Sequence, residues 1–169
     1  MTRMAASRSR ALLVAAALVA VVGCDRATKS LAEATLADGE RRSFLADTVR
    51  LQYVENRGAF LGLGRDLGEA ARFWVLLVAT GLLLAGAAAM AFRAPARGAL
   101  EALAWALLIG GGVSNLADRA LRQGAVVDFL NVGLGPLRTG IFNVADVGIT
   151  TGTILLVAGA WLTRRRPAR

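Results

Sequence analysis

Four long runs without a charged residue restrict the folds that this chain can adopt. They cover residues 11–24, 73–92, 102–117 and 147–163. A bilayer core about 30 Å thick requires roughly 20 helical residues, so the second run can cross a membrane unaided and the others can with their flanking residues. Hydrophobic residues make up 56% of the sequence, above the about 45–50% of soluble domains. The chain is predicted to be a mainly α, integral membrane protein.

The predicted transmembrane helices cover 10–28, 72–92, 98–118 and 141–163, within a single domain spanning 1–169. Nine arginines precede the first helix, join the second to the third or follow the fourth. With Glu101 counted, that side carries the entire net charge of +8. Positive loops face the cytoplasm, so both termini are predicted to be cytoplasmic. The basic charge thus reflects orientation and gives no support to nucleic-acid binding.

The remaining segments, 29–71 and 119–140, are then extracytoplasmic loops. Within the first, residues 43–54 alternate enough between apolar and polar side chains to predict one or two short strands on the membrane surface. The expected architecture is four transmembrane helices with a small extracytoplasmic β-structure.

The composition also limits the chemistry. The sequence has no histidine and one cysteine. These counts exclude Ser-His-Asp and Cys-His mechanisms, histidine-ligated metals, intramolecular disulfides and cysteine-rich zinc sites. Carboxylates, hydroxyls, arginines and the single lysine, Lys29, remain, and we expect no metal or other cofactor.

Four aspartates are predicted to lie at the same membrane depth. Asp25, Asp118 and Asp146 lie at the extracytoplasmic ends of the first, third and fourth helices, and Asp128 lies in the loop between the last two. Ionisable groups at this depth usually face a polar cavity and are candidate functional residues. The simpler interpretation, that each only marks a helix end, weakens when four converge.

One four-residue pattern occurs twice, as Asn115 with Asp118 and as Asn143 with Asp146. The spacing i to i+3 puts amide and carboxylate on one helix face, where they can share hydrogen bonds. Asp118 lies near a helix C-terminus, where the helix dipole opposes a carboxylate. We therefore expect Arg119 to compensate the charge of Asp118.

Apolar residues at 126, 127, 129 and 130 flank Asp128, and such surroundings tend to raise the pKa of a carboxyl group. If Asp128 approaches Asp146, the two cannot easily both ionise. One would then be a base that activates water and the other an acid that protonates a scissile carbonyl. This is the logic of an aspartic peptidase, although the sequence alone leaves open whether the two meet.

Three consecutive glycines at 110–112 precede Asn115. Small residues allow close approach of helix backbones in membranes, so we expect a helix contact here.

Five motifs in order resemble the bacterial lipoprotein signal peptidases, also called signal peptidase II. They are DRATK (25–29), NRGAF (56–60), GGGVSNLADR (110–119), VVDF (126–129) and FNVAD (142–146). The resemblance implies a membrane aspartic endopeptidase that removes signal peptides from diacylglyceryl-modified prolipoproteins by cutting before the lipidated lipobox cysteine. It also implies a bacterial cytoplasmic (inner) membrane location, with the active site near the extracytoplasmic leaflet.

The same resemblance makes Asp128 and Asp146 the catalytic pair. It implies substrate-binding or supporting roles for seven further residues: Asp25, Lys29, Asn56, Asn115, Asp118, Arg119 and Asn143. Segment 29–71 looks like the family's small β-cradle around the substrate. The expected partners are diacylglyceryl-prolipoproteins and membrane lipids, and we expect a monomer.

Several alternatives stay open. VVGC (21–24) passes as a lipobox, in which case cleavage before Cys24 would remove the first helix. A small proton-coupled membrane transporter would use the aspartates as a relay. A catalytically altered paralogue would bind lipoprotein precursors without cutting them. A Ser-Lys hydrolase would use Lys29, which is more simply interpreted as an interfacial anchor.

Overall fold

The computed structural model describes residues 2–58, 68–93 and 98–164, so the last two residues of the NRGAF motif lie outside it. The described part contains four helices and four strands: α1 (Thr2–Leu36), β1 (Arg42–Phe44), β2 (Val49–Asn56), α2 (Glu69–Arg93), α3 (Ala99–Leu121), β3 (Val126–Leu134), β4 (Leu137–Arg138) and α4 (Val144–Arg164). Each helix is long and apolar enough to cross a membrane. The predicted fold class is confirmed.

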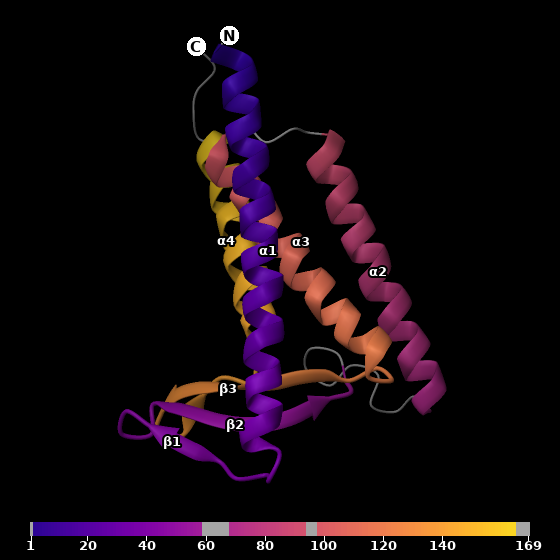
Figure 1. The fold of residues 1–169 in the computed structure, drawn as a ribbon, viewed down its shortest axis with the longest axis vertical. Helices are drawn as coiled ribbons and strands as arrows, with labels where there is room; N and C mark the ends of the chain where they lie inside the picture. Colours follow the sequence, from indigo (N-terminus) through magenta and orange to yellow (C-terminus); the bar gives the residue numbers. More distant parts are fainter. Residues whose placement is uncertain (1, 59–67, 94–97, 165–169) are drawn as a thin grey trace.

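The sheet lies across one end of the helices, while the start of α1 and the end of α4 lie at the other (Figure 1). Helix α3 is central and packs against α1, α2 and α4. Helix α1 is longer than the predicted span at both ends, so Asp25 lies well inside it and not at its end. Helix α4 begins at Val144, three residues later than predicted.

The sheet is antiparallel with strand order β1-β2-β3-β4. The first two strands fall where alternation predicted them, but β3 lies in a segment that we predicted as loop, so Asp128 is a strand residue. The first four residues of β3 are all buried. A strand buried on both faces shows no alternation, so the usual sequence signal is missing. Phe129 packs against Ala32 and Leu36 in the last turns of α1.

Two glycines set the close approach of α3 and α4. A Cβ atom on Gly111 would collide with the carbonyl oxygen of Ala145, and one on Gly152 would lie 2.5 Å from that of Ala104. The backbones of α3 and α4 are therefore in contact at positions where only the hydrogen side chain of glycine fits. This confirms the predicted contact at residues 110–112. This contact brings the start of α4 to the face of α3 that carries Asn115.

Gly111→Ala is expected to lower the free energy of unfolding by about 1–3 kcal/mol, the usual cost of overpacking. Gly86→Ala in α2 is the matched control, because a Cβ there meets nothing within 4 Å. That control should be neutral or stabilise by up to about 1 kcal/mol, since alanine favours helix. Chemical unfolding in detergent measures both, and equal effects would contradict the close-contact interpretation.

Candidate active site

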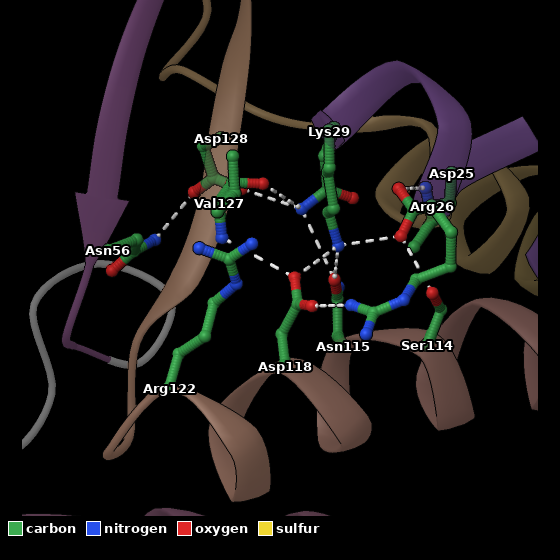
Figure 2. Close-up of polar contacts among 12 residues, drawn as sticks. Asp25, Arg26, Lys29, Asn56, Ser114, Asn115, Asp118, Arg122, Val127 and Asp128 are labelled. Atoms are coloured by element: carbon green, nitrogen blue, oxygen red, sulfur yellow. Dashed lines mark hydrogen bonds and ion pairs between the residues drawn. The ribbon is translucent and has the colours of Figure 1, made fainter. Parts of the chain in front are cut away.

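The site lies where α1, α3, the start of α4 and the β2–β3 pair meet. The structure places all nine predicted site residues at this junction: Asp25 and Lys29 on α1, Asn115, Asp118 and Arg119 on α3, Asn56 at the end of β2, Asp128 on β3, Asn143 just before α4 and Asp146 in its first turn. Most of them belong to one hydrogen-bonded network (Figure 2).

A reciprocal pair of hydrogen bonds starts α4. The backbone N–H of Asp146 donates to Asn143 Oδ1 at 2.9 Å, and the backbone N–H of Asn143 donates to Asp146 Oδ2 at 3.2 Å. This is a capping box, in which residues three apart satisfy each other's free N–H groups at a helix N-terminus. It explains why α4 begins at Val144, and it holds the Asp146 carboxylate where the helix dipole favours a negative charge.

Asn143 also connects Asp146 to Asp128. Its Nδ2 donates to Asp128 Oδ1 at 2.6 Å, and Asn56 Nδ2 donates to Asp128 Oδ2 at 2.9 Å. Asn143 is fully buried and Asp128 is 3% exposed. Asn143 thus contacts both carboxylates, that of Asp128 with its side-chain amide and that of Asp146 with its backbone N–H, which the sequence could not establish.

The pKa of Asp128 is raised to about 6, mainly by burial and also by the nearby charge of Asp146. The hydrogen bonds from Asn56 and Asn143 and the charge of Lys29 act in the opposite direction. Desolvation dominates because it penalises only the charged form. Asp128 can therefore hold a proton at a pH where an ordinary aspartate is ionised.

This raised pKa predicts a pH-dependent stability. The pKa rises from the ordinary 3.8 to about 6 on folding, so the contribution of Asp128 is complete below pH about 4 and lost as pH rises through about 6. The difference between these two pKa values corresponds to about 3 kcal/mol of unfolding free energy. We expect Asp128→Asn to remove this part of the slope of unfolding free energy against pH, measured by chemical unfolding in detergent. Asp38→Asn, at an exposed position, should keep the slope, and an unchanged slope in Asp128→Asn would contradict the assignment.

The two other aspartates bind Lys29. Lys29 Nζ lies 2.6 Å from Asp25 Oδ2 and 2.8 Å from Asp118 Oδ2, and Arg26 pairs with the other oxygen of Asp118. We call Asp25, Arg26, Lys29 and Asp118 the Lys29 cluster. Its two cations and two carboxylates balance, which offsets the cost of burying charge. Because Lys29 is 1% exposed, its interpretation as an interfacial anchor is wrong.

Asp25 joins three helices. Its Oδ1 accepts the backbone N–H of Ala145 at 2.8 Å, and its Oδ2 accepts the hydroxyl of Ser114 at 2.7 Å as well as Lys29. Ser114 therefore donates to a carboxylate, while Lys29 is held in two ion pairs. This arrangement provides no Ser-Lys nucleophile and base. Sequence reasoning missed the structural roles of Ser114 and Arg26, because both lie within the quoted motifs but have their partners on other helices.

Arg119 does not pair with Asp118, contrary to prediction, because Arg26 and Lys29 occupy that carboxylate. Its Nη2 donates instead to the carbonyl of Gly58 at 3.1 Å. Its charge is attracted to Asp128 and Asp146. Its Nε is buried and has no hydrogen-bond partner among the described residues. The guanidinium therefore has an unused donor near the carboxylate pair.

The described residues contain no group of three or more histidine, cysteine or acidic side chains arranged to hold a metal ion. The site carboxylates accept hydrogen bonds from amides or pair with cations. The chemistry that these side chains can supply is proton transfer and hydrogen bonding.

The family model described as Signal peptidase (SPase) II matches residues 17–162. The chain belongs to the signal peptidase II family. Membership agrees with the resemblance carried by the five motifs, and the matched range contains every site residue named above.

Curated relatives agree. A lipoprotein signal peptidase of Rhizorhabdus wittichii is 40% identical over 115 residues, which cover 68% of this chain but only 64% of that protein. One from Syntrophomonas wolfei is 34% identical over 149 residues, covering 88% of this chain and 93% of that protein. A bacterial membrane enzyme solved by the in meso method at 2.3 Å shares the fold, with a TM-score of 0.77, 24% identity and coverage of 92% and 93%.

Proposed function

We propose that this protein removes signal peptides from prolipoproteins, cutting on the amino side of a diacylglyceryl-modified cysteine. The observation that carries the proposal is the pair of aspartates joined through Asn143, one of which has its pKa raised to about 6. Two carboxyl groups that share one proton supply both the acid and the base of an aspartic peptidase. Membership of the signal peptidase II family supports the substrate class.

In this mechanism Asp128 and Asp146 are the catalytic residues. The ionised carboxylate takes a proton from water as the water attacks the scissile carbonyl carbon, and the protonated carboxyl gives its proton to the carbonyl oxygen. Collapse of the tetrahedral intermediate breaks the C–N bond, and a proton moves to the leaving amine. Arg119, whose Nε has no partner among the described residues, and the amide of Asn56 lie near the pair and would hold the substrate backbone.

The same proposal includes the topology of a multi-pass protein of the bacterial cytoplasmic membrane. The start of α1, the end of α2, the start of α3 and the end of α4 lie away from the sheet (Figure 1), and the excess arginines fall in or next to these segments in the sequence. That end would face the cytoplasm, which puts the sheet and the site on the extracytoplasmic side. We propose a single domain that acts as a monomer, with substrate acyl chains remaining in the bilayer.

The test is a cleavage assay with purified protein in detergent. The substrates are a diacylglyceryl-modified prolipoprotein and its unmodified precursor, and mass spectrometry reads the product ends. We expect the enzyme to cut only the modified substrate, and to cut it on the amino side of the modified cysteine. A folded protein that cuts neither substrate would refute the activity and favour a catalytically altered paralogue. The same spectra test the lipobox alternative, because an enzyme that begins with a lipidated Cys24 would refute our topology.

A further inference from the structure

The side-chain amide of Asn115 lies between Lys29 and Asp146. Lys29 Nζ donates to Asn115 Oδ1 at 2.9 Å, and Asn115 Nδ2 donates to Asp146 Oδ1 at 2.8 Å. Figure 2 shows Lys29 directed at Asn115 from α1, with Asp25 and Asp118 on either side. Lys29 therefore reaches the catalytic pair through one neutral side chain.

Donor and acceptor chemistry allows only one orientation of this amide. A lysine ammonium has three N–H donors and no acceptor. Asp25, Asp118 and the carbonyl oxygen of Asn115 take these three donors. If the amide were flipped, its NH₂ group would face the ammonium and its oxygen would face the carboxylate of Asp146, two repulsive contacts in a buried place.

A second amide is oriented in the same way. The backbone N–H of Asp146 can only donate, so Asn143 presents Oδ1 to it and turns Nδ2 toward Asp128. The same Nδ2 lies 3.2 Å from Asn115 Oδ1. Each catalytic carboxylate thus receives an amide whose direction is set by a neighbouring group that can only donate.

We propose that Lys29 is a positioning residue: by holding the carbonyl oxygen of Asn115 it keeps the NH₂ of Asn115 on Asp146, so that Asp146 is the ionised member of the pair and Asp128 carries the shared proton. This inference rests on the proposed function. Asp146 is the better site for the negative charge because it also caps the N-terminus of α4. Asp128 lies on a strand and has no helix dipole.

Arg26 separates this role from simple charge balance. Both cations belong to the Lys29 cluster and both pair with Asp118, but only Lys29 contacts Asn115. Removal of either cation changes the charge of the cluster equally. An effect found at Lys29 and absent at Arg26 is therefore specific to Lys29, which acts on the pair through the amide and through its own charge.

Other charged groups also lie near Asp128 and Asp146 and affect the pH dependence of cleavage. Within the described residues they are Lys29 and Asp25 from α1 and Arg119 from α3, with Asp118 acting on Arg119. A useful variant must therefore leave the net charge of the Lys29 cluster unchanged. Lys29→Met combined with Asp118→Asn does so, because it removes one positive and one negative charge.

The experiment records kcat/KM against pH for cleavage of the diacylglyceryl-modified prolipoprotein, with thermal unfolding in detergent as the check of folding. We expect the acidic limb of Lys29→Met/Asp118→Asn to move to higher pH by about one to two units, because losing an oriented hydrogen bond disfavours the ionised base. Asn115→Leu, which keeps all four charges of the Lys29 cluster, should move the limb similarly. Arg26→Met should keep the wild-type profile.

A folded double variant with the wild-type acidic limb would overturn the positioning role, as would an equal shift in Arg26→Met. If the double variant does not fold, Asn115→Leu still tests the proposal, because an unmoved acidic limb there also overturns it. These outcomes leave the peptidase assignment intact, because they require that wild type cleaves. Absence of cleavage by folded wild type refutes the proposed function, and the positioning role with it.

Discussion

Replacing either Asp128 or Asp146 by asparagine is expected to lower the rate of prolipoprotein cleavage by about 10⁴-fold, the upper part of the range for a positioned acid or base. Asparagine keeps the size of the side chain but can neither take nor give the required proton. Because the two carboxyl groups act as one unit, the double variant should be no worse than either single variant.

The cleavage assay with purified variants measures this loss, and thermal unfolding confirms that each variant is folded. Asp38→Asn is the matched control, since it makes the same chemical change at an exposed aspartate outside the site. It should cleave as wild type does. Turnover near the wild-type rate by Asp128→Asn or Asp146→Asn would remove the proposed dyad.

Asp25→Ala is expected to lower the free energy of unfolding by about 3–5 kcal/mol and to abolish activity. The substitution leaves the Lys29 ammonium buried with one carboxylate fewer, the situation in which breaking a buried ion pair is most costly. It also releases Ser114 on α3 and the backbone N–H of Ala145 on α4. The start of α4 would then lose its direct bond to α1.

Glu33→Ala is the control for that experiment. Glu33 also lies on α1 and pairs with Arg122, which follows α3, but its side chain is 46% exposed. Exposed ion pairs contribute about 0–1 kcal/mol, so this loss should be small. Chemical unfolding in detergent compares the two variants. Similar small losses would show that the Asp25 contacts contribute little to stability.

The sequence was most informative where burial in lipid imposes a single pattern. Four uncharged runs predicted four helices, because every backbone polar group must be satisfied within a membrane span. The ends of the helices were harder to predict. α1 continues beyond Asp25 and Lys29 because these two charges pair with each other and Lys29 also pairs with Asp118 on α3. No local pattern reports this second partner, which lies about 90 residues away.

The site residues divide in the same way into local patterns, which the sequence shows, and contacts between helices, which it does not. The repeated pattern was singled out from the sequence, but its two copies have different structural roles. Asn143 and Asp146 form the capping box of α4, a local device that precedes an apolar run and could have been recognised from the sequence. Asn115 and Asp118 lie inside α3, and their partners come from α1 and α4, so only the packed structure assigns them.

The capping box has a consequence for heat inactivation. Helix ends fray before helices melt, yet here the bonds that close the first turn of α4 also hold Asp146 and orient Asn143 toward Asp128. Fraying of that single turn would separate the two carboxyl groups while all four helices remain in place. We therefore expect heat to abolish cleavage at a lower temperature than the one at which the helix bundle unfolds.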